Sequence, residues 1–200
     1  MNAMPVLETS RLIIRPFVLE DLADVQRLFD VEINANELGT DATQTVQDRL
    51  EWLQWSVLNY TALARLNQPP YGDRAILLKP SLQLIGSCGY VPCLMPFEQM
   101  ANFSYFNTSG KPGYATTEFG LFYAISPSHQ RQGYASEAAR ALVDYAFQQL
   151  DLQRIIATTH FENAASIGVM RRLGMRVERN PLKSPPWLQV VGVLENPEAG

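Results

Sequence analysis

The chain has 200 residues, a length that fits one globular domain, or one domain with a modest insertion, around a full hydrophobic core. Hydrophobic residues make up 46% and charged residues 18%, which is typical of a soluble protein. The formal net charge is −4 and no cluster of lysines and arginines is present. We therefore expect no nucleic acid and no anionic membrane as a partner, since both need clustered basic residues.

Cysteine usage bounds the chemistry further. The two cysteines, Cys88 and Cys93, are too few for a disulfide scaffold, and no second Cys or His cluster accompanies them. We expect no metal site, a buried and unreactive thiol at Cys88, and a cytoplasmic, reducing location. The N-terminus lacks the charged start and long apolar core of a signal peptide, and no apolar run reaches membrane length.

The N-terminal part alternates between strand and helix patterns. Arg11–Phe17 is apolar and β-branched and predicts a strand. Leu19–Phe29 has apolar residues at helical spacing and acids at its start, which favour a helix. A second helix is predicted with Asp41 or Thr43 as its cap. The apolar stripe of that helix comprises Val46, Leu50, Leu53 and Val57. Trp52 and Trp55 flank this stripe, and we assign both to packing.

The middle of the chain is strand-rich. Asp73–Lys79 and Leu82–Val91 predict a hairpin-like strand pair, and Glu118–Ile125 is apolar on both faces, as in a buried central strand. Between them, Pro92–Thr117 is too long for a tight turn and predicts an excursion. It is either a lid or a hairpin that covers core, and its aromatic residues are Phe97, Phe103, Tyr105, Phe106 and Tyr114.

The C-terminal part returns to helix and strand. A helix with one apolar face runs through Ala135–Phe147, a strand covers Arg154–His160, and a short helix begins near Asn163 and is stopped by Gly174. Two strands close the chain. The whole order predicts an α/β architecture on one mixed sheet, in a single domain over residues 1–200.

A polar loop, SPSHQRQGY, joins the strand that ends at Ile125 to the helix that includes Ala135. The first N–H groups of a helix have no partner inside it, and the helix dipole adds positive potential there. A phosphate group satisfies both, Gly133 would let it approach, and Arg131 could add a charged contact. From this loop alone, an anion site and an ordinary helix start are equally open. The Gly-Lys-Ser/Thr ending of a kinase-type loop and the dinucleotide G-x-G-x-x-G fingerprint are both absent.

Three motifs together resemble one family. Gln130–Ala135 resembles the Gln/Arg-x-x-Gly-x-Gly/Ala signature of the GNAT N-acetyltransferase superfamily. Asn163–Met175 is similar to the Asn-x-x-Ser…Leu-Gly-Phe/Met segment of its RimJ/RimL-like branch, and Glu8–Leu22 looks like the Thr-x-Arg-Leu-x-Leu-Arg start of that branch. The resemblance implies a GNAT-type domain, with a mostly antiparallel twisted sheet flanked by helices and a splayed pair of central strands.

The resemblance also implies acetyl-CoA as cosubstrate. In GNAT proteins the signature loop holds the diphosphate through backbone amides, and the preceding strand pairs with the pantetheine arm. Asn163 and Ser166 match positions that contact that arm, although Asn163 also suits a helix cap. The residues implied in cofactor binding are Tyr123, Ala124, Ile125, Arg131, Gln132, Gly133, Tyr134, Ala135, Ser136, Asn163 and Ser166.

The implied reaction is direct attack of a primary amine on the acetyl thioester in a ternary complex. Glu118 is the candidate base if burial makes its carboxylate more basic, and it is an exposed strand-edge residue otherwise. His160 and Glu162 are secondary candidates. Many GNAT enzymes have a tyrosine acid where this chain has Met170.

The acceptor is expected to be a protein N-terminus or a small-molecule amine, selected by the first two helices, the excursion and the C-terminal segment. Trp187 in that segment is assigned to packing. The protein is expected to be a monomer or a homodimer. The alternative is a non-catalytic CoA-binding or sensing module. Two features would suit it: Met170 at the tyrosine position, and Glu118 two residues before Gly120, where many RimJ/RimL-like chains carry their glutamate.

Overall fold

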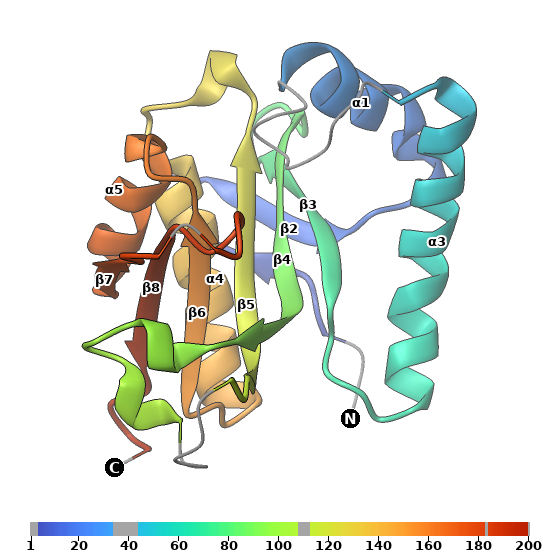
Figure 1. The fold of residues 1–200 in the computed structure, drawn as a ribbon. Helices are drawn as coiled ribbons and strands as arrows, with labels where there is room; N and C mark the ends of the chain where they lie inside the picture. Colours follow the sequence, from blue (N-terminus) through green and yellow to red (C-terminus); the bar gives the residue numbers. More distant parts are fainter. Residues whose placement is uncertain (1–3, 34–43, 108–112, 183, 200) are drawn as a thin grey trace. The chain divides into compact units, whose positions relative to one another are not determined.

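The computed structural model describes residues 4–33, 44–107, 113–182 and 184–199 (Figure 1). Its eight strands form one mixed sheet in the order β1-β2-β3-β4-β5-β6-β8-β7. The pairs β1/β2, β2/β3, β3/β4, β6/β8 and β7/β8 are antiparallel, and β5/β6 is parallel. The α/β fold class and the mostly antiparallel sheet are therefore confirmed. The strands are β1 Leu7–Glu8, β2 Leu12–Pro16, β3 Gly72–Leu78, β4 Leu84–Met95, β5 Thr116–Ile125, β6 Arg154–Thr159, β7 Arg176–Arg179 and β8 Val190–Glu195.

The helical elements are α-helices, short 3-10 turns and one π-helix. They are η1 Leu19–Asp21, α1 Leu22–Gln26, the π-helix η2 Arg27–Glu32, α3 Val46–Arg65, η3 Phe97–Gln99, η4 Ser104–Phe106, η5 Pro127–His129, α4 Tyr134–Gln149 and α5 Ala164–Leu173. No helix within the described residues has the length and apolar character needed to cross a membrane.

Contacts group the chain into two compact units. The first comprises Met1–Tyr90 and Phe122–Leu142, and the second comprises Val91–Leu121 and Val143–Gly200. The strands β4 and β5 and the helix α4 each contribute residues to both units. Each unit has its own core and is described separately below.

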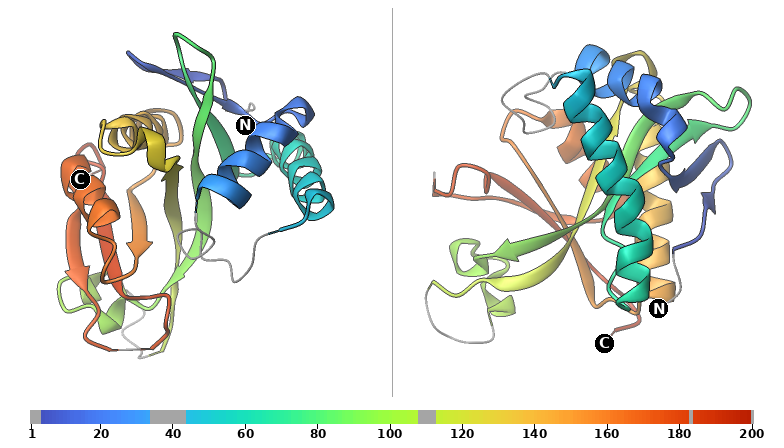
Figure 2. Two further views of the ribbon diagram at one scale, coloured as in Figure 1. Left: turned by 90° about the horizontal axis from the view of Figure 1, so that it is seen from above. Right: turned by 90° about the vertical axis from the view of Figure 1, so that its right-hand side faces the viewer.

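In the first unit, α1, η2 and α3 pack on one face of β2, β3 and β4 (Figure 2). Cross-strand partners share a face, so the pairs Ile13–Leu77 and Arg15–Ala75 lie on the side of these helices. Tyr90 lies on the opposite face and donates a 2.6 Å hydrogen bond to the Leu142 carbonyl of α4. The core between strands and helices comprises Phe17, Val25, Leu28, Phe29, Ile33, Leu53, Ala75, Leu77 and Leu84.

The start of α3 differs from the prediction. Its cap is Thr45, whose hydroxyl accepts from the Asp48 amide while the Asp48 carboxylate accepts from the Thr45 amide. The caps predicted from the sequence, Asp41 and Thr43, are wrong and lie outside the described residues. A reciprocal capping box satisfies two terminal amides at once, which favours this start.

The buried face of α3 is also rotated from the predicted stripe. Val46 is 52% exposed, whereas Arg49 and Ser56 are buried beside Leu53. Arg49 is buried because its guanidinium pairs with Asp30, with N–O distances of 2.9 and 2.6 Å. A stripe of apolar residues cannot reveal a buried ion pair, so the predicted face was partly wrong.

The two tryptophans of α3 have different surroundings. Trp52 packs edge-on against Phe17 and Phe29, with ring centroids 5.5 Å apart in each pair, so the packing role is confirmed. Trp55 is 57% exposed, and its assignment to packing was wrong. The predicted strand Arg11–Phe17, the helical segment at residues 19–29 and the β3–β4 hairpin are all confirmed, although the segment divides into η1, α1 and η2.

The second unit contains β5, β6, β8 and β7, with α5 against β6, β7 and β8. Gly174 ends α5 in the left-handed conformation, with φ of 89°, as predicted. The segment after β4 covers the sheet, since its side chains join the second core. That core comprises Met95, Phe97, Met100, Phe103, Phe106, Ile156, Leu188, Val191 and Val193.

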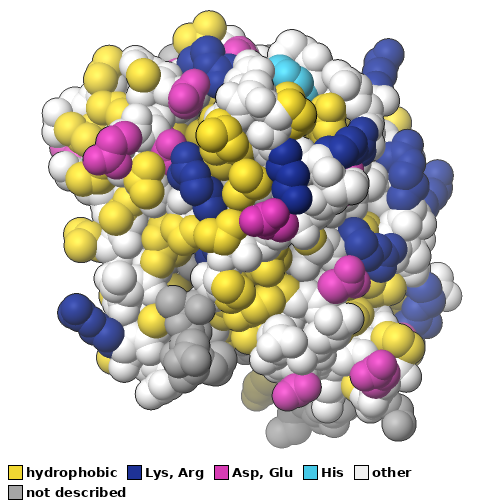
Figure 3. Space-filling view, turned by 180° about the vertical axis from the view of Figure 1, so that it is seen from behind, with side chains coloured by type: hydrophobic (Ala, Val, Ile, Leu, Met, Phe, Trp, Pro, Cys, Tyr) yellow, Lys and Arg dark blue, Asp and Glu magenta, His cyan; other side chains and the backbone are white. Residues whose placement is uncertain are grey.

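These contacts decide between the two interpretations of Pro92–Thr117. Phe97, Phe103 and Phe106 cover core rather than forming an aromatic lid, whereas Tyr105 and Tyr114 are more than half exposed. The assignment of Trp187 to packing was wrong, because this side chain is 45% exposed. On the face of the described residues drawn in Figure 3, basic and acidic side chains are interspersed with hydrophobic ones.

Candidate cofactor site and buried carboxylates

The loop between β5 and α4 is attached to the strand end by two hydrogen bonds. The Ser126 amide donates to the Ile85 carbonyl at 2.8 Å, and the Gln130 side-chain amide donates to the Ile125 carbonyl at 3.1 Å. Arg131 and Gly133 then adopt positive φ values of 61° and 86°. Gly133 adopts this conformation without strain, and this reversal leads the chain directly into α4.

The amides that follow have no acceptor within the described chain. The first intrahelical bond runs from the Glu137 amide to the Gly133 carbonyl, at 3.0 Å. Among the described residues, no hydrogen bond is formed by the successive N–H groups from Arg131 to Ser136. The Ser136 hydroxyl is also buried without a partner there. Consecutive unpaired donors at the positive end of a 16-residue helix favour a bound anion.

There is room beside this loop. A Cβ built on Gly133 would meet only the Arg11 guanidinium, at 3.4 Å, and no backbone atom within 4 Å. Arg131 is exposed, and its guanidinium forms no hydrogen bond, ion pair or ring contact with another described residue. These features fit the phosphates of a nucleotide cofactor, whose oxygens would accept charge-assisted hydrogen bonds from such donors.

The strand segment expected to pair with the pantetheine arm is closely packed at one end. A Cβ on Gly86 of β4 would lie 2.4 Å from the Ala124 carbonyl, so only glycine allows this approach. The Ile125 carbonyl already accepts from Gln130. Pairing of a ligand with Tyr123, Ala124 and Ile125 stays a prediction.

Asn163 and Ser166 are brought together at the start of α5. The Asn163 side chain is the N-cap, and its oxygen accepts from the Ser166 amide at 3.0 Å. The capping role considered from the sequence is therefore observed. Their role in binding the cofactor stays a prediction, since capping and ligand contact can coexist.

Glu118 is buried, with 4% of its surface exposed, so it is not a solvated strand-edge residue. Both of its carboxylate oxygens accept from Arg154, at 2.7 and 2.6 Å. The guanidinium also lies over the ring of Phe106, 4.4 Å from its centroid. Arg154 therefore occupies both carboxylate oxygens, and Glu118 would have to be released from it before it could accept a substrate proton.

A second carboxylate, Asp73 of β3, was not singled out from the sequence. Burial raises its pKa to about 6, against the opposing effect of Arg49. Within the described residues, its carboxylate has no hydrogen bond and no ion pair. An acid at the start of a predicted strand usually lies at a solvated end, so only the structure reveals that Asp73 is partly buried.

The remaining candidates have little support. His160 and Glu162 are exposed, and Met170 is completely buried in the second unit, so no acid occupies that position. Cys88 is buried, as expected, and burial raises its thiol pKa, which favours the predicted lack of reactivity. No group of three or more His, Cys, Asp or Glu side chains suited to a metal lies within the described ranges.

Comparison with known proteins decides the family. Residues 11–176 match the family described as Acetyltransferase (GNAT) domain. The chain belongs to the GNAT family, in its RimJ/RimL-like branch. It is an N-acetyltransferase of that family, with an α/β GNAT fold.

Known GNAT relatives agree with this assignment. The uncharacterized N-acetyltransferase p20 of Bacillus licheniformis is 30% identical over 177 residues, covering 88% of this chain and 84% of that protein. The uncharacterized N-acetyltransferase YnaD of Bacillus subtilis (strain 168) is 47% identical over 66 residues, covering 33% of this chain and 38% of that protein.

Among solved structures, RimL, described as a ribosomal L7/L12 alpha-N-protein acetyltransferase in complex with coenzyme A, superposes on the chain with a TM-score of 0.61. It is 17% identical to the chain, and the match covers 94% of each protein. At this identity the likeness concerns the GNAT fold.

Proposed function

We propose that this GNAT enzyme binds acetyl-CoA through the amides from Arg131 to Ser136 and transfers the acetyl group to a primary amine. The observation that carries this proposal is that, among the described residues, the donors at the start of α4 and the buried Ser136 hydroxyl have no hydrogen-bond partner. The space at Gly133 and the exposed guanidinium of Arg131 suit a diphosphate. When bound, acetyl-CoA supplies the acetyl thioester.

The reaction we propose is direct transfer in a ternary complex. The amine nitrogen attacks the thioester carbonyl carbon, a C–N bond forms and the C–S bond breaks. The sulfur leaves as a thiolate, and the nitrogen loses one proton as the amide forms. In this scheme the chain holds the donor's phosphates at α4, which turns an encounter of two ligands into a reaction between positioned groups.

The need for a base depends on the acceptor. An alkylamine with a pKa of about 10.4 is neutral at pH 7 in about one molecule in several thousand, whereas an α-amine with a pKa of about 8 is neutral in about one in ten. A protonated alkylamine must lose a proton before it can attack, and two carboxylates are candidates for the base that takes this proton. Glu118 would first have to be released from Arg154, whereas Asp73 has no cation bound within the described residues.

A thiol-release assay with a panel of amines tests the function. We expect release of free CoA with at least one class of acceptor, a protein N-terminus or a small alkylamine. Because RimL is described as an α-N-protein acetyltransferase, peptides with a free N-terminus form one arm of the panel and diamines form the other. The absence of release with every amine, despite CoA binding, would contradict the catalytic proposal.

The base is assigned by comparing Glu118→Gln, Asp73→Asn and the control Arg154→Gln on the folded fraction of each variant. A base residue is the one whose amide variant loses alkylamine turnover at least 100-fold, while peptide α-amines lose less. Arg154→Gln removes the cation and keeps the Glu118 carboxylate. If Glu118→Gln and Arg154→Gln reduce stability alike and leave turnover unchanged, Glu118 is structural.

Two observations favour a second function, a non-catalytic CoA-binding module. The expected tyrosine position is the buried Met170, and the expected base is bound to Arg154. A thiolate is a tolerable leaving group without an acid, so these features do not remove the catalytic proposal. Tight CoA binding without thiol release would support the sensing module instead.

A further inference from the structure

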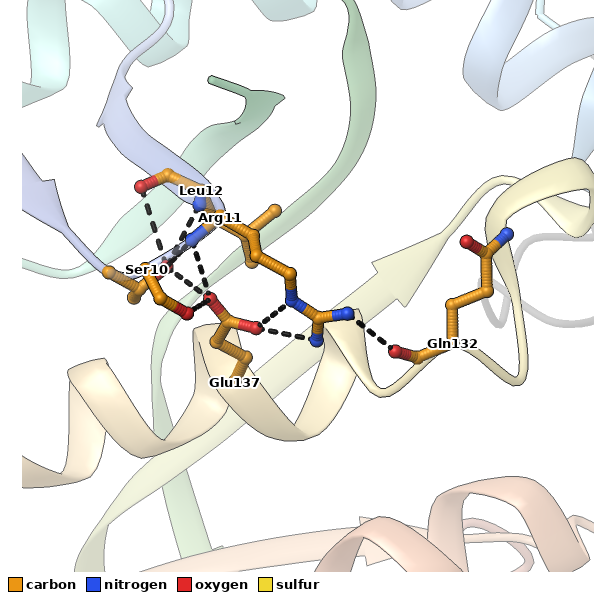
Figure 4. Close-up of polar contacts among 6 residues, drawn as sticks. Ser10, Arg11, Leu12, Gln132 and Glu137 are labelled. Atoms are coloured by element: carbon orange, nitrogen blue, oxygen red, sulfur yellow. Dashed lines mark hydrogen bonds and ion pairs between the residues drawn. The ribbon is translucent and has the colours of Figure 1, made fainter. Parts of the chain in front are cut away.

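The turn between β1 and β2 converges on one carboxylate of α4, that of Glu137 (Figure 4). Its Oε1 accepts from the Thr9 hydroxyl at 2.5 Å, the Ser10 hydroxyl at 3.1 Å and the Arg11 amide at 3.0 Å. Its Oε2 accepts from Nε and Nη2 of Arg11, at 2.7 and 2.6 Å. Both oxygens are fully used by a segment about 126 residues earlier in the chain.

Arg11 also contacts the signature loop itself. Its Nη1 donates to the Gln132 carbonyl at 3.0 Å (Figure 4). Its guanidinium carbon lies 4.4 Å from the centre of the Tyr134 ring. One side chain therefore connects the loop, the first residue of α4 and the carboxylate one turn later. Figure 4 shows the guanidinium between Glu137 and the Gln132 carbonyl.

These contacts have a consequence for the direction of one amide. In a trans peptide, the carbonyl of one residue and the N–H of the next point in opposite directions within one plane. The bond from Arg11 holds the Gln132 carbonyl on the Arg11 side. The Gly133 N–H of the same peptide is thereby turned away from Arg11.

The contacts of Arg11 also affect the negative charge of Glu137 at the start of α4. A carboxylate in the first turn of a helix stabilises the helix by itself, but it repels an anion bound at the same end. The Glu137 side chain is 16% exposed, so its charge is only partly screened by water. Pairing with Arg11 cancels this charge, and the hydrogen bonds keep the pKa of Glu137 below its usual value despite partial burial.

We propose that Arg11 is a positioning residue for the phosphates of the acyl donor, acting through Glu137 and the Gln132 carbonyl. This inference rests on the proposed function of the loop. Arg11 neutralises the one carboxylate in the first turn of α4 and fixes the orientation of the loop peptide. The chemical class that it serves is a diphosphate, whereas a donor without phosphates gains nothing from it.

Calorimetric titration with CoA and with pantetheine, which lacks the diphosphate, tests this inference. Arg11→Gln should weaken CoA binding about 10- to 50-fold, since it leaves the Glu137 charge uncancelled, and should leave pantetheine binding unchanged. Arg11→Lys keeps the positive charge without the bidentate contact to Glu137 and should lose less CoA affinity than Arg11→Gln. In the double variant Arg11→Gln/Glu137→Gln, most of the CoA affinity should return.

The control is Lys79→Gln. Lys79 forms a 3.0 Å ion pair with Glu8 of β1, near the same turn, and has no contact with the loop. It should bind CoA like the wild type, and thermal unfolding establishes that every variant is folded. An unchanged CoA affinity in Arg11→Gln would overturn the inference, as would an equal loss with pantetheine or no recovery in the double variant. Failure of the wild type to bind CoA would instead overturn the proposed function.

Discussion

The helices α5 and α4 begin in opposite ways. At the start of α5, the Asn163 side chain accepts from the Ser166 amide, so the chain satisfies its own donor. At the start of α4, Gly133 has no side chain, and the amides up to Ser136 have no acceptor among the described residues. A helix N-terminus that is capped by the chain's own side chain stabilises the helix. A terminus left open sacrifices a cap of about 1 kcal/mol and retains donors for a ligand.

Filling the open terminus should have the largest effect. We predict that Gly133→Val weakens CoA binding more than 100-fold, because the branched side chain occupies the space beside the amides. The positive φ adds strain of about 1–3 kcal/mol. Calorimetric titration measures the affinity and urea unfolding measures the strain.

The chain offers a matched control for that substitution. Gly113 has the same φ of 86°, and no atom of the other described residues lies within 4 Å of a built Cβ. Gly113→Val should therefore show similar strain with wild-type CoA affinity. Equal loss of affinity in both variants would contradict the assignment of the loop.

The contrast between satisfied and open groups extends to the carboxylates. Glu118 is bound by Arg154, whereas Asp73 has no such partner in the described chain, and its pKa is raised to about 6. An acid whose pKa is raised on folding binds more protons in the native state between pH 4 and 6, so its contribution destabilises the fold as pH rises through this window.

Asp73→Asn should consequently raise the free energy of unfolding by about 3 kcal/mol at pH 7.5 and by less than about 1 kcal/mol at pH 4. Urea unfolding at the two pH values is the measurement. The exposed residue Glu162 provides the control, since Glu162→Gln should change stability at neither pH. A loss of stability at pH 7.5 in Asp73→Asn would show that the carboxylate has a stabilising partner.

The buried hydroxyl at the open terminus should have a smaller effect. Ser136→Ala removes an unpaired polar group, so the free protein should be as stable as the wild type or slightly more stable. Because one hydrogen bond to the ligand is lost, CoA should bind about 5- to 10-fold more weakly. Thermal unfolding with and without CoA measures both effects.

A second buried, unpaired hydroxyl, that of Ser87 in β4, provides the comparison. Ser87→Ala should be neutral or stabilising in the same way, with CoA affinity unchanged. If Ser136→Ala also left the affinity unchanged, Ser136 would not contact the ligand.

The smallest effect is expected at the closed terminus. Asn163→Ala should lower the free energy of unfolding by about 1 kcal/mol through loss of the cap. If capping is its whole role, CoA affinity should change less than twofold. A loss of CoA affinity beyond fivefold, in a variant that is still folded, would show that α5 also binds the cofactor. The two helices would then differ in capping but not in ligand binding.

Local rules predicted many elements from the sequence. Apolar spacing, Gly174 and the short hairpin turn indicated α4, α5 and the β3–β4 pair, since each depends on residues close together in the chain. Tertiary contacts overrode these rules in α3, where the ion pair between Arg49 and Asp30 rotates the buried face. The exposed Trp55 and Trp187 likewise show that size and hydrophobicity do not decide burial.

The site was predicted as a motif but not as a set of contacts. The signature loop is contiguous, so its glycine and the following helix could be read directly. Arg154 lies 36 residues from Glu118, and Arg11 lies 126 residues from Glu137. Spacing carries no information on such pairs, and an expected base therefore proved to be bound to an arginine.

The most direct test of the central claim is a titration of ¹⁵N-labelled protein with CoA and with pantetheine, followed by the amide resonances from Arg131 to Ser136. We predict that CoA shifts the resonances of Gly133, Tyr134 and Ser136 strongly, in proportion to binding, and that pantetheine leaves them in place. Saturation with CoA while these amides stay unshifted would contradict the claim that the start of α4 holds the phosphates.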